Sequence, residues 1–79
     1  MPKNAVLYGT AHCHLCDQAT ALVAPITQQY DVELATIDIA GDASLEARYE
    51  LLIPVLVVGD AALNWPFDAI QVAEFLRKC

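Results

Sequence analysis

The sequence predicts an α/β domain in which a mixed four-stranded sheet is flanked by helices, in the order β-α-β-α-β-β-α. Three observations predict it. Apolar runs of strand length alternate with stretches whose apolar residues recur at helical spacing. The first helix connects two strands, and such a β-α-β unit is parallel and right-handed. The last two strands are joined by a tight Gly59-Asp60 turn, which makes them antiparallel. We expect residues 1–79 to form this single domain.

The first strand and the first helix occupy the first thirty residues. The segment from Asn4 to Gly9 carries an apolar run closed by glycine, which is typical of a strand buried on both faces. From about Cys13 to Tyr30, apolar residues recur every three or four positions and mark one face of a helix. Pro25 lies inside this stretch. Because proline has no backbone N–H, we expect the helix to kink near Leu22 or to end early.

A second strand and a short helix follow. Apolar and polar residues alternate from Val32 to Ile39, which predicts a strand. Gly41, Asp42 and Ser44 then predict a turn with a capping residue. We expect this turn to lead into a short helix that carries Leu45, Tyr49 and Leu52.

The last third of the chain predicts a strand pair and a final helix. The segment from Ile53 to Asp60 reads as a strand entered through Pro54, and Ala61 to Asn64 reads as a brief partner strand. After Trp65-Pro66, Asp68 is followed three residues later by Gln71, a pattern that resembles a capping box. We therefore expect a helix through Leu76, ended by basic residues.

Charge and composition exclude several classes of function. Ten acidic side chains face four basic ones, a formal net charge of −6, so nucleic acid and anionic membrane surfaces are not expected partners. No secretory segment and no apolar run of bilayer length is visible in the sequence. We expect a cytoplasmic monomer, in a compartment that keeps thiols reduced. Three cysteines, an odd number, argue against a static disulfide framework.

Cys13 and Cys16 are the residues most suggestive of chemistry. Two cysteines three positions apart at a helix start lie about one turn from each other, within reach of a disulfide. Free backbone N–H groups and the helix dipole stabilise a thiolate there, so we predict a lowered pKa for the Cys13 thiol. The thiolate is the attacking species in thiol–disulfide exchange. Cys16, further into the helix, is expected to be more buried and to resolve the mixed disulfide.

The surrounding residues leave alternatives open. His12, Cys13, His14 and Cys16 are all possible zinc ligands, although neighbouring residues at a helix start point in different directions. A metal or iron–sulfur carrier, and a non-catalytic binding module that keeps the fold, therefore remain alternatives to a redox enzyme. His14 would favour the thiolate if its imidazole is protonated or hydrogen-bonded, or would have no effect if it is exposed and neutral.

The Ile53-Pro54 peptide is the second informative position. Proline at the first residue of a strand is ordinary, but a cis bond would be a deliberate feature. It would turn the backbone of Ile53 toward the thiols and expose its N–H and C=O groups. An extended substrate could then pair with this backbone like an added strand.

The chain resembles glutaredoxin-like members of the thioredoxin superfamily. The resemblance is carried by the strand Ala5-Val6-Leu7-Tyr8, by Cys13-His14-Leu15-Cys16 heading a helix, by Ile53-Pro54-Val55, and by the closing strand pair and helix. It implies a thioredoxin-like, glutaredoxin-type fold and a thiol–disulfide oxidoreductase acting on protein or low-molecular-weight disulfides. It also implies that Cys13 is the nucleophile, Cys16 the resolving thiol and Pro54 a cis-proline beside them. The expected substrate contacts are His12, His14, Leu15, Ile53 and Pro54.

Some family features are replaced in this chain. Thr10 stands where glutaredoxins usually carry a basic residue that helps to hold glutathione, and Trp65-Pro66 replaces a double glycine that approaches glutathione closely. Arg48 is the only nearby candidate for the missing positive charge. Leu7 stands about where thioredoxins bury an acidic residue. We expect no bound cofactor, with glutathione left open as a reductant.

Overall fold

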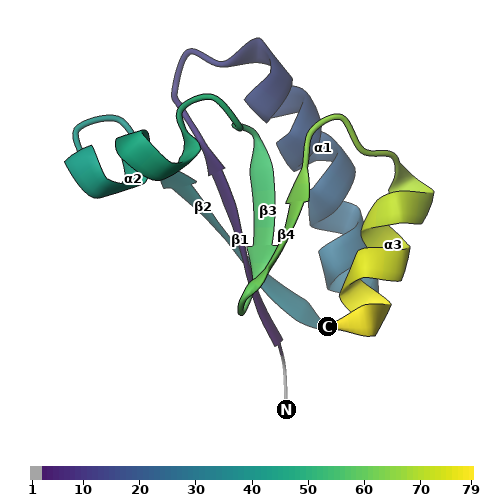
Figure 1. Cartoon of the computed structure of the whole chain (residues 1–79). Helices are drawn as coiled ribbons and strands as arrows, with labels where there is room; N and C mark the ends of the chain where they lie inside the picture. The colour runs from purple at the N-terminus through teal and green to yellow at the C-terminus, as the bar shows by residue number, and fades with distance from the viewer. Residues whose placement is uncertain (1–2) are drawn as a thin grey trace.

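The computed structural model describes residues 3–79 and has the element order that the sequence predicts (Figure 1). The strands are β1 (Lys3–Gly9), β2 (Val32–Asp38), β3 (Val55–Val58) and β4 (Ala61–Asn64). The helices are α1 (His14–Gln29), α2 (Ala43–Tyr49) and α3 (Ala69–Lys78).

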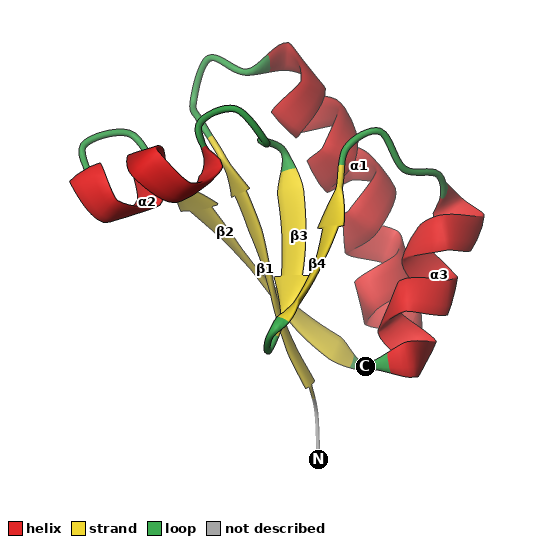
Figure 2. Ribbon diagram, in the orientation of Figure 1, coloured by secondary structure: helices red, strands yellow, loops and turns green. Residues whose placement is uncertain are grey.

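The four strands form one mixed sheet in the order β2-β1-β3-β4. β1 and β2 are parallel, while β1–β3 and β3–β4 are antiparallel, as the predicted β-α-β unit and tight turn require. Leu7 of β1 lies opposite Thr36 on one side and Leu56 on the other. α1 and α3 lie together on one face of the sheet, and the short α2 lies at one end of the other face (Figure 2).

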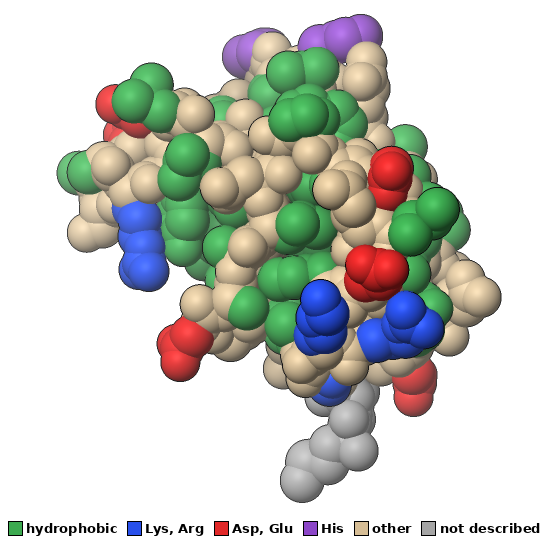
Figure 3. Space-filling model, turned by 45° about the vertical axis from the view of Figure 1, so that its right-hand side comes forward, with side chains coloured by type: hydrophobic (Ala, Val, Ile, Leu, Met, Phe, Trp, Pro, Cys, Tyr) green, Lys and Arg blue, Asp and Glu red, His purple; other side chains and the backbone are tan. Residues whose placement is uncertain are grey.

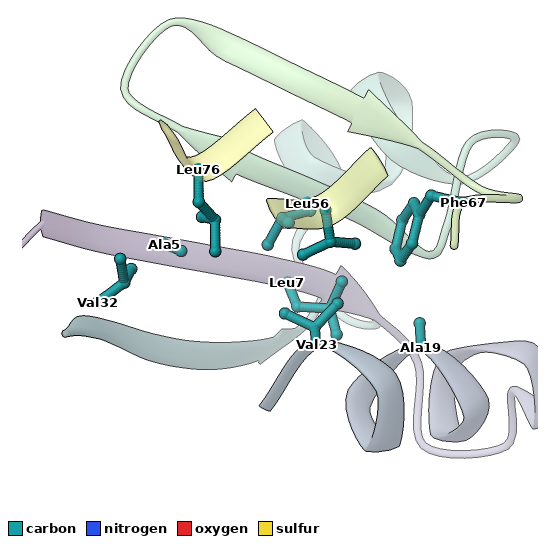
Figure 4. Close-up of a cluster of buried hydrophobic side chains, with 9 residues drawn as sticks. Ala5, Leu7, Ala19, Val23, Val32, Leu56, Phe67 and Leu76 are labelled. Atoms are coloured by element: carbon teal, nitrogen blue, oxygen red, sulfur yellow. The ribbon is translucent and has the colours of Figure 1, made fainter. Parts of the chain in front are cut away.

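The larger core lies between the sheet and the pair α1 and α3 (Figure 4). Alternate residues of each strand point into it, because successive side chains of a strand face opposite sides of the sheet. Burying one Val or Leu side chain contributes about 1.5–3 kcal/mol. The buried members of this core are Ala5, Leu7, Ala19, Val23, Val32, Leu56, Phe67, Val72 and Leu76.

A smaller core lies on the opposite face, under α2. Ile39, Tyr49 and Val55 are buried there. The ring of Tyr8 stacks on that of Tyr49 with 4.4 Å between the ring centroids. Tyr8 follows Leu7 in β1, so one strand supplies both cores and holds α1 and α2 in fixed positions about its end.

Of the two effects expected of Pro25, a kink or an early end, the early end does not occur, since α1 continues to Gln29. Proline inside a helix costs about 3 kcal/mol through its missing N–H and its ring. Burial on either side offsets this cost, because Val23 and Thr27 are both almost completely buried while Pro25 itself is exposed. Local preference is therefore overridden by packing.

Two boundaries also differ from the expected ones. α2 ends at Tyr49, so Leu52 lies beyond the helix, where its N–H donates to the Tyr49 carbonyl over 2.8 Å. β3 begins at Val55 rather than at Ile53, because the Ile53 N–H also donates to the Tyr49 carbonyl and Pro54 has no N–H to donate. The chain therefore enters the sheet two residues later than the apolar pattern suggests.

The start of α3 is as predicted. The Gln71 N–H donates to Asp68 Oδ1 over 2.8 Å, and the Asp68 N–H donates to Gln71 Oε1 over 3.0 Å, which completes the capping box. No helix in the described residues 3–79 combines the length and the apolar character needed to cross a bilayer.

Candidate functional site

Cys13 is the N-cap residue of α1. Its backbone is extended, with φ −97° and ψ 109°, and its Sγ accepts a hydrogen bond from the Cys16 N–H over 3.1 Å. The Cys13 N–H donates to the Thr10 carbonyl over 3.3 Å, which fixes the turn between β1 and the helix. The sulfur therefore takes the position in which Ser or Asp usually satisfies a free N–H of the first helical turn.

Cys13 and Cys16 are joined by a disulfide. Their Cα atoms are 5.1 Å apart, inside the roughly 4.4–6.8 Å range of ordinary disulfides. The spacing arises because one helical turn brings residue i+3 back to the same side of the helix start. Cys16 is only 6% exposed and Cys13 is half-buried, so the outer sulfur belongs to Cys13, as the sequence predicts.

Gly9 lets Cys16 Sγ, the inner sulfur of the pair, lie against the end of β1. A methyl group built on Gly9 would lie 2.8 Å from Cys16 Sγ and 3.0 Å from Cys16 Cβ, closer than real contacts allow. Any side chain at this position would displace Cys16 or the strand. The sequence assigned Gly9 only the end of a strand and did not predict this contact.

Leu7 lies in the larger core and is 3% exposed. Among residues 3–79, Thr27 is the only buried polar or charged side chain, so no buried carboxylate lies behind the cysteine pair. A proton that leaves or reaches Cys16 must therefore be exchanged with groups or water nearer the surface.

The Ile53–Pro54 peptide bond is cis, as the resemblance implied. Val55 lies opposite Tyr8, so Pro54 adjoins the end of β1 from which the chain leads to the cysteines. Pro54 is fully buried. Its carbonyl accepts from the Trp65 N–H over 3.2 Å, which ties the β4–α3 loop to the same place.

The expectation that both backbone groups of Ile53 are free is wrong. The Ile53 N–H donates to the Tyr49 carbonyl over 3.0 Å, because α2 ends directly before this segment. In the described residues 3–79, its carbonyl oxygen has no backbone partner. An approaching chain therefore meets an acceptor at Ile53 but no free donor.

His12, His14 and Leu15 flank Cys13 in sequence and are exposed to solvent. Both histidines are exposed, and Leu15 is 45% exposed although it is a large apolar residue. The imidazoles lie at one end of the molecule (Figure 3), where apolar side chains also reach the surface. The helix start thus presents a mixed polar and apolar rim around Cys13.

A cavity of about 580 Å³ adjoins Cys16 where α1 faces the ends of β1 and β2. Its polar lining residues are Thr10, Asp17, Thr20, Thr36 and Asp38. This cavity was not predicted, because the residues of its two walls, 7–21 and 36–38, meet only through the parallel β1–β2 pairing. In the described part of the chain, no group of three or more His, Cys, Asp or Glu side chains is arranged to hold a metal ion.

Cys79, the third cysteine, is neither paired nor part of this site. It is half-buried, and its N–H donates to the Phe75 carbonyl over 3.2 Å. The last residue is thus attached to the final turn of α3.

Comparisons with known proteins agree with this architecture. Residues 4–77 match the family described as glutaredoxin-like domain (DUF836). No curated protein matches the sequence.

Several solved structures are similar over nearly the whole chain. The crystal structure of the target protein XcR50 from X. campestris is 35% identical, with a TM-score of 0.81 over 95% of this chain and 97% of that one. The protein Ne2328 from Nitrosomonas europaea is 28% identical, with a TM-score of 0.78 over 95% and 92%. Thioredoxin 1 from Thermosipho africanus is 15% identical, with a TM-score of 0.74 over 95% and 91%, and shares the fold.

Proposed function

The chain belongs to the glutaredoxin-like domain (DUF836) family of the thioredoxin superfamily, and on that premise we propose that it is a thiol–disulfide oxidoreductase. One observation carries the proposal: a disulfide joins the residue that caps α1 to the residue one turn into the helix. Such a pair forms and opens by thiol–disulfide exchange with little movement of the backbone.

In the proposed reaction, the dithiol form reduces a disulfide substrate. The Cys13 thiolate attacks one substrate sulfur, the substrate S–S bond breaks, and one substrate thiolate leaves. Cys16, as a thiolate, then attacks Cys13 Sγ, which forms the Cys13–Cys16 bond and releases the second substrate thiolate. The protein loses two electrons, the substrate gains them, and protons from solvent complete two substrate thiols.

The helix start supports the role of Cys13 as the nucleophile. The Cys16 N–H that donates to Cys13 Sγ stabilises negative charge on that sulfur, and the helix dipole acts in the same direction. Cys13 is also the more exposed of the two sulfurs, so a substrate reaches it first. Cys16, buried against Gly9, is protected from substrate until the mixed disulfide forms.

We assign substrate contact to the rim of the site. His12, His14 and Leu15 are exposed beside the disulfide, and the Ile53 carbonyl can accept one backbone hydrogen bond from an extended substrate. Pro54 is buried, so we assign it to shaping the segment before β3 rather than to direct contact.

The proposed substrates are disulfides of proteins or of small thiols, and the reaction needs no bound cofactor. Glutathione stays a candidate for an external reductant. We further propose that the protein works as a monomer in the cytoplasm, where thiol reductants keep such pairs in the dithiol form.

Trapping tests the proposal. In Cys16→Ser, Cys13 can still attack, but the mixed disulfide has no resolving thiol, so substrates should stay attached and be identifiable by mass spectrometry. Cys13→Ser, which keeps Cys16 and Cys79, is the matched control and should trap nothing. If both variants trap the same proteins, or if Cys13 alkylates no faster than Cys79, the proposed nucleophile is wrong. Absence of a reversible Cys13–Cys16 couple in a redox titration would instead favour a binding module.

A further inference from the structure

The cavity beside Cys16 is lined by residues other than those of the rim that is proposed to meet protein substrates. It is bounded by the first turns of α1, by the end of β1 and by the end of β2. Ile53 and Pro54 are not among its lining residues. The volume of about 580 Å³ is large enough for a small molecule, because ligand pockets commonly span about 300–1,000 Å³.

The two charged side chains that line the cavity are both acidic. Asp17 and Asp38 supply carboxylates, and both residues are exposed to solvent. The Thr20 hydroxyl donates its proton to the Cys16 carbonyl over 3.0 Å, so its lone pairs are what it offers to the cavity. Among the described lining residues there is no Lys, Arg or His. A ligand that brings donors and positive charge complements such a lining.

The basic residues lie elsewhere. Lys3 donates from Nζ to the Leu76 carbonyl over 3.4 Å, beside the last turn of α3 that carries Arg77 and Lys78. That end of the molecule is opposite the start of α1 (Figure 1), and in Figure 3 the Lys and Arg side chains lie away from the imidazoles. Arg48 lies over the Tyr49 ring, 5.4 Å from its centroid, on the α2 side of the sheet. Among the described residues, no Lys or Arg side chain therefore lines the cavity beside its two carboxylates.

We propose that this cavity receives the cationic arm of an aminothiol, so that the preferred small-molecule substrates are disulfides carrying ammonium groups rather than carboxylates. The inference rests on the proposed oxidoreductase function and names its substrate class. Cys16, the disulfide partner of Cys13, lines the cavity, and so does Thr10, whose carbonyl accepts from the Cys13 N–H. The proposal places the arm of a substrate bound to Cys13 Sγ in this cavity.

The charge of the substrate affects the rate of the first thiol–disulfide exchange. The Cys13 thiolate attacks the disulfide of an aminothiol, one aminothiol leaves, and the other stays bound to Cys13. Cys16 then attacks Cys13 Sγ and releases the second aminothiol, so two electrons pass from the protein to the substrate. Opposite charges near a cleft raise encounter rates by about tenfold or more, and the effect falls as salt screens it.

Three small disulfides test the proposal: cystamine, which is cationic, bis(2-hydroxyethyl) disulfide, which is neutral, and glutathione disulfide, which is anionic. The reduced Cys79→Ser protein is mixed with each at pH 8, and formation of the Cys13–Cys16 bond is followed by alkylation and mass spectrometry. Each rate is divided by the rate for dithiothreitol with the same disulfide, which removes differences in intrinsic reactivity.

The expected order is cystamine fastest and glutathione disulfide slowest, with about a tenfold or larger gap at low salt. High salt should lower the cystamine rate and raise the glutathione disulfide rate. Asp17→Asn and Asp38→Asn should each slow the reaction with cystamine several-fold. The matched control is Asp60→Asn, which removes the same charge from the β3–β4 turn outside the cavity and should change the rate less than about twofold.

Two results overturn the inference while leaving the proposed function intact. One is equal normalised rates for all three disulfides, and the other is an Asp60→Asn effect as large as that of Asp17→Asn. If none of the three disulfides oxidises the protein, including the neutral one, the proposed function itself fails and the inference fails with it.

Discussion

The starts of α1 and α3 have the same geometry and different chemistry. In each, an extended N-cap residue accepts a hydrogen bond from the N–H three positions on: Cys13 Sγ from Cys16 over 3.1 Å, and Asp68 Oδ1 from Gln71 over 2.8 Å. At α3, Gln71 returns a second hydrogen bond and closes a capping box. At α1, the residue three positions on is a cysteine that bonds to the cap itself.

The difference shows how one backbone feature serves two purposes. A carboxylate at an N-cap is charged at neutral pH and stabilises the helix continuously. A sulfur in that place is a stronger acceptor as a thiolate than as a thiol or in a disulfide, so the groups that stabilise the helix start also stabilise the reactive form of the residue. The cap of α3 therefore acts on stability, whereas the proposed role of the cap of α1 is reactivity.

The largest expected effect is on the disulfide exchange activity of the cysteine pair at the start of α1. In Cys13→Ser, disulfide exchange should fall to background because no nucleophilic sulfur remains at the helix start. Serine is a preferred N-cap, so the unfolding free energy should stay within about 1 kcal/mol of that of the reduced parent protein. Activity with a small disulfide and chemical denaturation check both parts. Residual exchange that disappears only when Cys16 is also replaced would contradict the assignment of Cys13.

The second prediction concerns the close contact between Gly9 and Cys16. Gly9→Ala places a methyl group 2.8 Å from Cys16 Sγ, so we expect a loss of stability of about 1–3 kcal/mol, as for other overpacked sites. The midpoint of the disulfide redox titration should also shift, since Cys16 must move relative to Cys13. Denaturation of reduced and oxidised protein, with the redox titration, measures these effects.

A double-mutant cycle isolates the cause of the Gly9→Ala effect. Cys16→Ala removes the sulfur but keeps Cβ, so part of the stability loss caused by Gly9→Ala should disappear in that background. Additive losses would mean that the added methyl group acts on the strand rather than on the inner sulfur.

The smallest expected effect is on the unfolding free energy, from removal of the cap of α3. Asp68→Ala removes the cap and one half of the capping box, and we expect a loss of about 1 kcal/mol in unfolding free energy. Asp68→Asn, which still accepts the hydrogen bond, should lose less. The rate of Cys13 alkylation should not change in either variant. A change in that rate would show that the two helix starts are coupled, contrary to the separation described above.

Much of the fold could be predicted because local chemistry and tertiary packing agree. The apolar run ending at Gly9, the Asp68–Gln71 capping pattern and the segment Ala61–Asn64 all form the predicted structures. Of the two effects expected of Pro25, the early end of the helix was wrong, because the local cost of proline is offset by buried neighbours on α1 that only the folded chain reveals. The family likewise follows from short local motifs along the chain, above all the cysteine pair.

The site was less predictable because its details depend on residues that meet only in the folded chain. The Ile53 N–H was expected to be free, but it donates to the Tyr49 carbonyl at the end of α2. The contact between Gly9 and Cys16 depends on how α1 leaves the sheet, and the cavity needs Asp38 from a strand that follows α1 by sequence. The pattern of residue types carries no information on such distances.

The Lys3–Leu76 hydrogen bond brings both ends of the described chain together at the pole away from the disulfide (Figure 1). A tether, a dye or a fused partner placed there leaves the proposed reactive surface uncovered. Cys79 at that pole supplies a sulfur for attachment. The molecule can thus be fixed to an electrode or a bead by one thiol while the electron exchange of the other two is read without obstruction.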